Sequence, residues 1–105
     1  MVAGDDIKVG QVVRSKAGRD KGRFFIVVSV EGDRVYLADG DLRRVEAPKK
    51  KNIKHIQVTG HVVEKIAEKI EKGQNLSNKE FRRELQSLGY LGDGMLEKGK
   101  KEVDA

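Results

Sequence analysis

The sequence predicts a mainly β fold, a small barrel of about five strands, followed by two C-terminal helices. As far as Gly60, short runs of β-branched and aromatic residues alternate with Gly, Asp and Pro turn signals, which is typical of strands joined by tight turns. Beyond Gly60 the apolar residues recur about every 3.6 positions, the period of an amphipathic helix. We therefore expect a barrel over residues 1–60, a helical appendage packed on it over 61–89, and a flexible tail over 90–105.

The first two strands flank a glycine-containing loop. The first is predicted over residues 11–15, and the second, over 23–30, is apolar for most of its length. Because successive side chains of a strand point to opposite faces, alternate residues of the second strand share a face. We assign to the barrel interior the face made by Phe24, Ile26, Val28 and Val30. Phe25 and Val27 on the other face then need cover, which the C-terminal helices would supply.

Turn signals set the remaining strands. Glu31-Gly32-Asp33 predicts one hairpin turn and Asp39-Gly40-Asp41 another, because Gly accepts positive φ and Asp favours turns. The strands between and after these turns are predicted over 34–38, 42–46 and 56–59. Pro48 ends the strand over 42–46, since proline has no amide hydrogen to donate, and residues 49–55 follow as a loop.

Two amphipathic helices are predicted after Gly60. The apolar stripe of the first consists of Val62, Val63, Ile66, Ala67 and Ile70. Gly73 suits its C-terminal cap, and Ser77 with Glu80 forms a capping box at the start of the second helix, which ends at Gly89. The second helix places on one face Phe81, Leu85 and Leu88. Helices this short are marginal alone, so they must dock, either on the barrel or on a protein partner.

The loop between the first two strands is strongly basic. Residues 14–23 contain five Lys or Arg, one acid and two Gly. The glycines let the backbone approach a ligand closely, and the cations attract anions. Residues 1–60 carry 13 Lys and Arg against 8 Asp and Glu, whereas residues 61–105 carry 9 against 9. The whole net charge of +5 therefore lies in the β part, which favours polyanion binding over the alternative that the charge is only solvated surface.

The segment Gly18-Arg19-Asp20-Lys21-Gly22-Arg23 resembles the turn of the KOW domain, in which a loop with glycine and basic residues joins two strands. The likeness continues through residues 35–40 and 56–60, over roughly half of the chain. It is strongest to the KOW proteins of the large ribosomal subunit of eukaryotes and archaea and to small bacterial KOW proteins. The resemblance implies a small SH3-like β-barrel that binds structured, ribosomal RNA.

We hypothesise that two basic segments contact RNA phosphates, with Gly18 and Gly22 shaping the first of them. The cations concerned are Arg14, Lys16, Arg19, Lys21 and Arg23 in the first segment and Arg43, Arg44, Lys49, Lys50, Lys51 and Lys54 in the second. RNA is favoured over DNA because no basic helix is available for a major groove. Tyr36 is the aromatic residue to test for stacking on a base, the alternative being that it only covers the barrel.

The alternative function is that of a protein-interaction module in the transcription-elongation or translation machinery, with ribosomal or transcription proteins as partners. Such a module would use the barrel or the two helices to hold another protein. Charge reversal in the basic loop discriminates the two hypotheses, because it should abolish RNA binding and leave a helix-mediated protein contact largely intact.

The sequence offers little for catalysis. It contains no Cys, and therefore no thiolate nucleophile, disulfide or Cys-based zinc site. It lacks both the H-E-x-x-H and the G-x-x-x-x-G-K-[ST] patterns, and His55 and His61 are separated by Gly60. We expect no enzymatic activity, no cofactor and no metal site. The acidic N-terminal residues and the lack of a long apolar run predict a cytoplasmic protein that does not enter a membrane and is a monomer when free.

Overall fold

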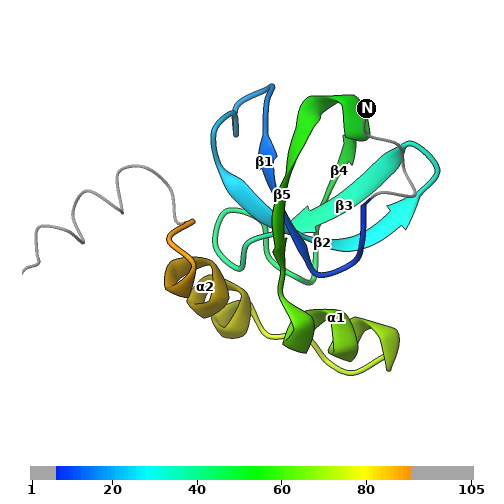
Figure 1. Cartoon of the computed structure of the whole chain (residues 1–105), viewed down its shortest axis with the longest axis vertical. Helices are drawn as coiled ribbons and strands as arrows, with labels where there is room; N and C mark the ends of the chain where they lie inside the picture. The colour runs from blue at the N-terminus through cyan, green and yellow to red at the C-terminus, as the bar shows by residue number, and fades with distance from the viewer. Residues whose placement is uncertain (1–6, 91–105) are drawn as a thin grey trace, which may run out of the picture.

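A computed structural model of the chain, which describes residues 7–90, has a five-stranded antiparallel sheet followed by two helices (Figure 1). The strands are β1 (Gln11–Ser15), β2 (Phe24–Glu31), β3 (Arg34–Ala38), β4 (Lys49–Asn52) and β5 (Ile56–Val62), and the helices are α1 (Glu64–Glu71) and α2 (Asn78–Ser87). A 3₁₀ turn, η2 (Ile53–His55), separates β4 from β5. The predicted mainly β fold with two C-terminal helices is confirmed. The flexible tail was predicted over 90–105, of which residues 91–105 lie outside the described residues. The prediction is wrong for Tyr90, which stacks on Phe24 and packs against the core.

The strand order in the sheet is β4-β3-β2-β1-β5, so β4 and β5 are the two ends of the order. The predicted first strand and the strand over 34–38 are confirmed, and the turn at Gly32 between β2 and β3 has the expected positive φ of 60°. The sheet is strongly curved. Strands β3 and β2 lie between β4 and β1, yet the ammonium group of Lys51 in β4 donates to the carbonyl oxygen of Ala17, just beyond β1, at 3.0 Å. Closure of the sheet into a barrel stays a prediction.

The predicted strand over 42–46 is wrong, and the fourth strand is formed by the lysine run instead. β4 pairs with β3 in the register Val35 with Lys51 and Leu37 with Lys49. The segment before it cannot be extended, because the amides of Asp39 and Gly40 both donate to the carbonyl oxygen of Arg43. The lysine run carries no apolar alternation, so its strand depends on the backbone hydrogen bonds with β3. The pattern of side chains in the sequence does not reveal such bonds.

The two faces of β2 were assigned the wrong way round. Phe25 and Val27 lie in the core cluster that contains no helix residue, together with Ile7, Val13, Val35, Leu37 and Ile56. Phe24 and Ile26 instead face the helices, in a second cluster with Val12, Val63, Ile66, Phe81 and Leu85. Because α1 and α2 contribute only to the second cluster, the first is buried by the curvature of the sheet itself.

Val30 is the one residue of the predicted inner face of β2 that was assigned correctly, and a register irregularity in β2 explains why. The pairing with β3 shifts between Val27 and Ser29, which places an extra residue in β2. An extra residue reverses the inward and outward alternation beyond it, so Val30 packs against the same cluster as Phe25 and Val27. Period-two reasoning therefore fails at this bulge.

The helices dock on the sheet, as one of the two sequence alternatives expected (Figure 1). The hydroxyl of Ser77 accepts from the Glu80 amide at 3.3 Å, which is half of the predicted capping box. The carboxylate of Glu80 does not complete the box, because it accepts from Lys69 of α1 at 2.7 Å and so ties the two helices together. No helix within residues 7–90 is long and apolar enough to cross a membrane.

Candidate nucleic-acid interface

The loop between β1 and β2, residues 16–23, is called the first basic loop below. It folds around the buried side chain of Asp20, whose Oδ1 accepts from the Ser15 hydroxyl at 2.7 Å and from the Lys51 ammonium group at 3.1 Å. Lys49 lies 3.5 Å from the other carboxylate oxygen, and Lys51 also donates to the carbonyl oxygen of Ala17 at 3.0 Å. These five residues, the Asp20 network, fix the loop against β4.

The charge of Asp20 is maintained by its neighbours. Burial alone raises the pKa of this carboxyl, but the hydrogen bonds from Ser15 and Lys51 and the positive charges of Lys51 and Lys49 outweigh burial and lower the pKa from its ordinary value of 3.8. Asp20 is therefore a carboxylate at neutral pH. The side chain of Lys51 is only 8% exposed, so its charge is used inside the protein and not at the surface.

The backbone of the first basic loop turns through two glycines in the left-handed region, Gly18 at φ 88° and Gly22 at φ 90°. The amide of Gly22 donates to the carbonyl oxygen of Ser15 at 2.8 Å and closes the loop at its base. With Asp20 turned inward, Lys16, Arg19 and Lys21 are left exposed. The loop is thus a fixed turn whose outward side chains are cationic.

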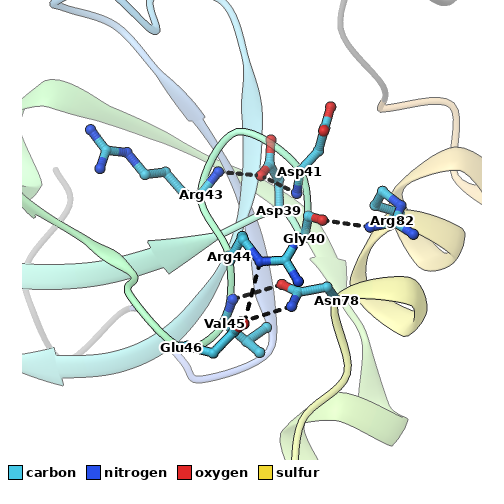
Figure 2. Close-up of polar contacts among 9 residues, drawn as sticks. All are labelled: Asp39, Gly40, Asp41, Arg43, Arg44, Val45, Glu46, Asn78 and Arg82. Atoms are coloured by element: carbon cyan, nitrogen blue, oxygen red, sulfur yellow. Dashed lines mark hydrogen bonds and ion pairs between the residues drawn. The ribbon is translucent and has the colours of Figure 1, made fainter.

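The loop between β3 and β4, residues 39–48, is called the second basic loop (Figure 2). It too folds around a buried aspartate, Asp39, whose Oδ1 accepts from the amides of Asp41 at 2.9 Å and Arg43 at 2.8 Å. Gly40 has a φ of 80°, and a Cβ at this position would collide with the backbone carbonyl oxygen of Asn78. Arg43 and Arg44 are exposed on this loop, and Arg44 pairs with Glu46 at 3.3 Å.

Helix α2 holds the second basic loop from the other side. Figure 2 shows Asn78 and Arg82 of α2 directed at the loop. The side chain of Asn78 accepts from the Val45 amide at 2.8 Å and donates to Glu46 at 2.7 Å, while Arg82 donates to the carbonyl oxygen of Gly40 at 2.7 Å. Sequence reasoning missed both residues, because neither the spacing nor the composition of a helix shows which distant loop it will contact.

Arg23 joins the two basic loops. Its Nη2 lies 3.2 Å from Oδ2 of Asp39 and 3.9 Å from the carboxylate of Asp41, and its side chain is 32% exposed. Together with the Asp20 network, this pair brings the two predicted basic segments into contact although they are separate in sequence. Arg23 and Lys51, both predicted to contact RNA, serve here as internal links.

The other predicted residues are distributed unevenly over the surface. The exposed ones are Arg14, Lys16, Gly18, Arg19, Lys21, Arg43, Arg44, Lys50 and Lys54. Gly22 and Lys49 are half-buried, the latter through its pair with Asp20. Tyr36 is also half-buried, and its hydroxyl lies 3.2 Å from a carboxylate oxygen of Glu31. The surviving candidates are thus the cations on the two loops and along β4 and η2.

A depression of about 310 Å³ adjoins the first basic loop and was not foreseen from the sequence. It is lined by Arg14, Gly22, Phe24, Gln57, Val58 and Thr59. The ring of Phe24 stacks on Tyr90 with a centroid distance of 4.5 Å, and the Tyr90 hydroxyl lies 2.5 Å from Nδ1 of His61. The depression lies beside the first basic loop and is therefore part of the candidate interface.

Comparison with known proteins adds no family to these observations: no protein-family model and no curated protein sequence matches this chain. The two loops and the depression beside them are therefore the features from which a function is inferred.

Proposed function

We propose that this protein binds structured RNA, ribosomal in kind, through a KOW-type surface formed by its two basic loops. The observation that carries the proposal is the way the first basic loop is held: Arg23 pairs with Asp39 of the second basic loop at 3.2 Å, and Asp20 pairs with Lys51 of strand β4 at 3.1 Å. These pairs neutralise the two buried acids, Asp20 and Asp39, so that the exposed charged side chains of the first basic loop are all cationic. The second basic loop keeps two exposed acids, Asp41 and Glu46, of which Glu46 pairs with Arg44. A loop whose backbone is already fixed suits a polyanion, because the loop need not be ordered when phosphates bind.

The proposed phosphate contacts are Arg14, Lys16, Arg19, Lys21, Arg43, Arg44, Lys50 and Lys54, all of them exposed. They extend from the two loops, from strands β1 and β4 and from the 3₁₀ turn η2, and not from one helix that could enter the major groove of DNA. The glycine and basic turn over 18–23 resembles the KOW turn, and this resemblance favours RNA as the ligand. Recognition of backbone and shape is the expected mode.

The alternative function, a module that holds another protein, is less favoured where it would use the two helices. The apolar residues that such a contact would use, Ile66 of α1 and Phe81 and Leu85 of α2, are buried against the sheet. Leu42 is the one large apolar side chain classed as exposed within residues 7–90, and a single exposed leucine is ordinary on a protein surface.

The test is fluorescence anisotropy with a structured ribosomal RNA fragment and a DNA duplex of matched length, each over a salt series. The wild type should bind RNA more tightly, with a log–log salt slope of about −0.7 to −0.9 for each phosphate contact. The variant Arg19→Glu/Lys21→Glu should lose most of the affinity and flatten the slope, whereas Arg23 is left intact because it joins the loops.

The matched control is Lys79→Glu/Arg83→Glu, which likewise reverses one lysine and one arginine, at exposed positions of α2. It should keep the RNA affinity within about twofold, since long-range charge is screened beyond about 8–10 Å at moderate salt. Weak and equal binding of the wild type to RNA and DNA would overturn the proposal, and so would an equal loss in the control.

A further inference from the structure

We propose that the depression beside the first basic loop binds one unpaired nucleobase of the RNA. This inference rests on the proposed function and names a subsite within it. The depression lies where β5, β1 and β2 run side by side, and its rim includes Gly22 of the cationic loop. A nucleotide whose phosphate meets the loop would therefore have this depression within reach of its base.

The strand register places three side chains of complementary chemistry in one row. Arg14 of β1 is paired with Phe24 of β2 on one side and with Gln57 of β5 on the other. Residues directly opposite each other in a sheet share a face, so the ring, the guanidinium group and the amide are neighbours. An aromatic ring stacks on a base, while guanidinium and amide groups supply donors and an acceptor to its edge.

The row remains accessible although the same face of the sheet carries the helices. Val12 and Ile26, further along β1 and β2, are fully buried beneath α1 and α2, whereas Arg14 and Gln57 are exposed. The hydroxyl of Thr59, also in the lining, is already used, since it donates to the carbonyl oxygen of Val12 at 2.8 Å. Hydrogen bonding to a ligand therefore falls to Arg14 and Gln57.

The size and the support of the depression suit a single base. Its volume of about 310 Å³ lies at the lower limit of the roughly 300–1,000 Å³ of small-ligand pockets, which fits one base and no extended ligand. Phe24 is held by its stack on Tyr90, with an interplanar angle of 30°, and Tyr90 is held in turn by His61. A ring fixed before binding loses little entropy when a base stacks on it.

The experiment compares two RNAs of equal length and charge, a hairpin with 2-aminopurine in its single-stranded loop and a fully paired duplex. The wild type should prefer the hairpin, and 2-aminopurine fluorescence should change on binding as the base enters the depression. Base stacking on an aromatic ring accounts for roughly 5- to 150-fold in affinity. Phe24→Leu should therefore reduce the preference for the hairpin at least about fivefold and leave the duplex affinity unchanged.

Gln57→Ala is the second variant, because Gln57 is exposed and its truncation leaves the core intact, whereas Phe24 also packs against the helix-side cluster. It should reduce the preference in the same direction, and Gln86→Ala on α2, the matched control, should not. Equal affinity for hairpin and duplex without a fluorescence change would overturn the base site. If Arg19→Glu/Lys21→Glu still lowers binding in that case, the proposed RNA-binding function survives, and if the wild type binds neither RNA, both proposals fail.

Discussion

The two basic loops are each folded around one buried aspartate, but the partners of the two carboxylates differ in kind. Asp20 is held by side chains, of which Lys51 is a cation exposed by only 8%. Asp39 is held mainly by neutral backbone amides, those of Asp41 and Arg43, and the one cation paired with it within residues 7–90, Arg23, is 32% exposed. The shape of the first basic loop thus depends on charge, whereas that of the second depends on hydrogen-bond acceptance.

The difference predicts opposite responses to an isosteric change. Asparagine keeps an oxygen at the Oδ1 position, which accepts the hydrogen bonds at both sites, and removes only the negative charge. At position 20 the charge removed neutralises a buried ammonium group, while at position 39 it faces a guanidinium group that water can reach. Replacing each aspartate with asparagine therefore distinguishes a loop held by charge from a loop held by hydrogen-bond acceptance.

The largest effect is expected for Asp20→Asn. Loss of the carboxylate leaves Lys51 buried without a compensating charge, and the new amide group points at Lys49, 3.5 Å from the oxygen it replaces. We expect the free energy of unfolding to fall by about 3 kcal/mol, the lower limit for breaking a buried pair, because the hydrogen bonds to Oδ1 remain. Urea denaturation followed by circular dichroism measures it.

Asp33→Asn is the matched control for this change, since Asp33 is 70% exposed and pairs only with the neighbouring Arg34. An exposed pair of this kind contributes less than about 1 kcal/mol, so the control should unfold close to the wild type. A loss below about 1 kcal/mol at position 20 would mean that Lys51 finds water or another partner, and that charge does not hold the first basic loop.

The pH dependence of stability is the next largest effect and has the same origin. The pKa of Asp20 is lowered in the folded protein from its ordinary value of 3.8, so the unfolded chain binds this proton more readily. The stability contributed by Asp20 is therefore fully present above pH 3.8 and is lost as the pH falls through the lower folded value. The quantity to measure is the difference in unfolding free energy between the wild type and Asp20→Asn.

That difference should be constant from neutral pH down to about pH 5 and should shrink only in more acidic solution, where the network breaks by protonation. The effects of pH on groups that the two proteins share cancel in this difference. A difference that declines near pH 6, or one that persists unchanged to pH 2, would contradict the assignment of the shift to Asp20.

Much of the fold could be predicted from local pattern, and the failures have local causes. The strand over 11–15 follows from its β-branched residues, the strand over 34–38 from alternation and a glycine turn, and the two helices from their 3.6-residue period. Val62, which was predicted on the first helix, ends β5 instead. The faces of β2 were reversed because both are apolar and both are covered, so alternation alone could not say which faced the helices. Strand β4 was missed because a run of lysines has no apolar alternation to mark it as extended.

The candidate site was predictable in composition but not in arrangement. The basic loop was identified from its charge and glycines. Nothing in the sequence shows that Asp20 accepts a hydrogen bond from Lys51, 31 residues away, or that Val45 donates one to Asn78, 33 residues away. Such pairs depend on the register of β4 and on the docking of α2, which only the tertiary structure sets. The same holds for the depression, which needs β1, β2 and β5 in one register.

The smallest effect is expected for Asp39→Asn, and it is the sharpest test of the comparison. The asparagine oxygen can accept from the amides of Asp41 and Arg43 as the carboxylate does, so the turn of the second basic loop is kept. The new amide group faces Arg23, 3.2 Å from the oxygen it replaces, but Arg23 is 32% exposed and can turn to water and to the carboxylate of Asp41, 3.9 Å away. We expect a loss below about 1 kcal/mol in the free energy of unfolding.

Asp39→Ala supplies the contrast, because alanine removes the acceptor as well as the charge. Two amides near the buried Asp39 side chain then lose their partner, which costs about 1–3 kcal/mol for an unsatisfied group, so alanine should be clearly worse than asparagine. At position 20, by contrast, the asparagine variant alone should already be strongly destabilised, because it leaves the charge of buried Lys51 uncompensated. Equal losses for the two variants at position 39 would show that Arg23, and not the backbone amides, holds the second loop, and the two aspartates would then act by one mechanism.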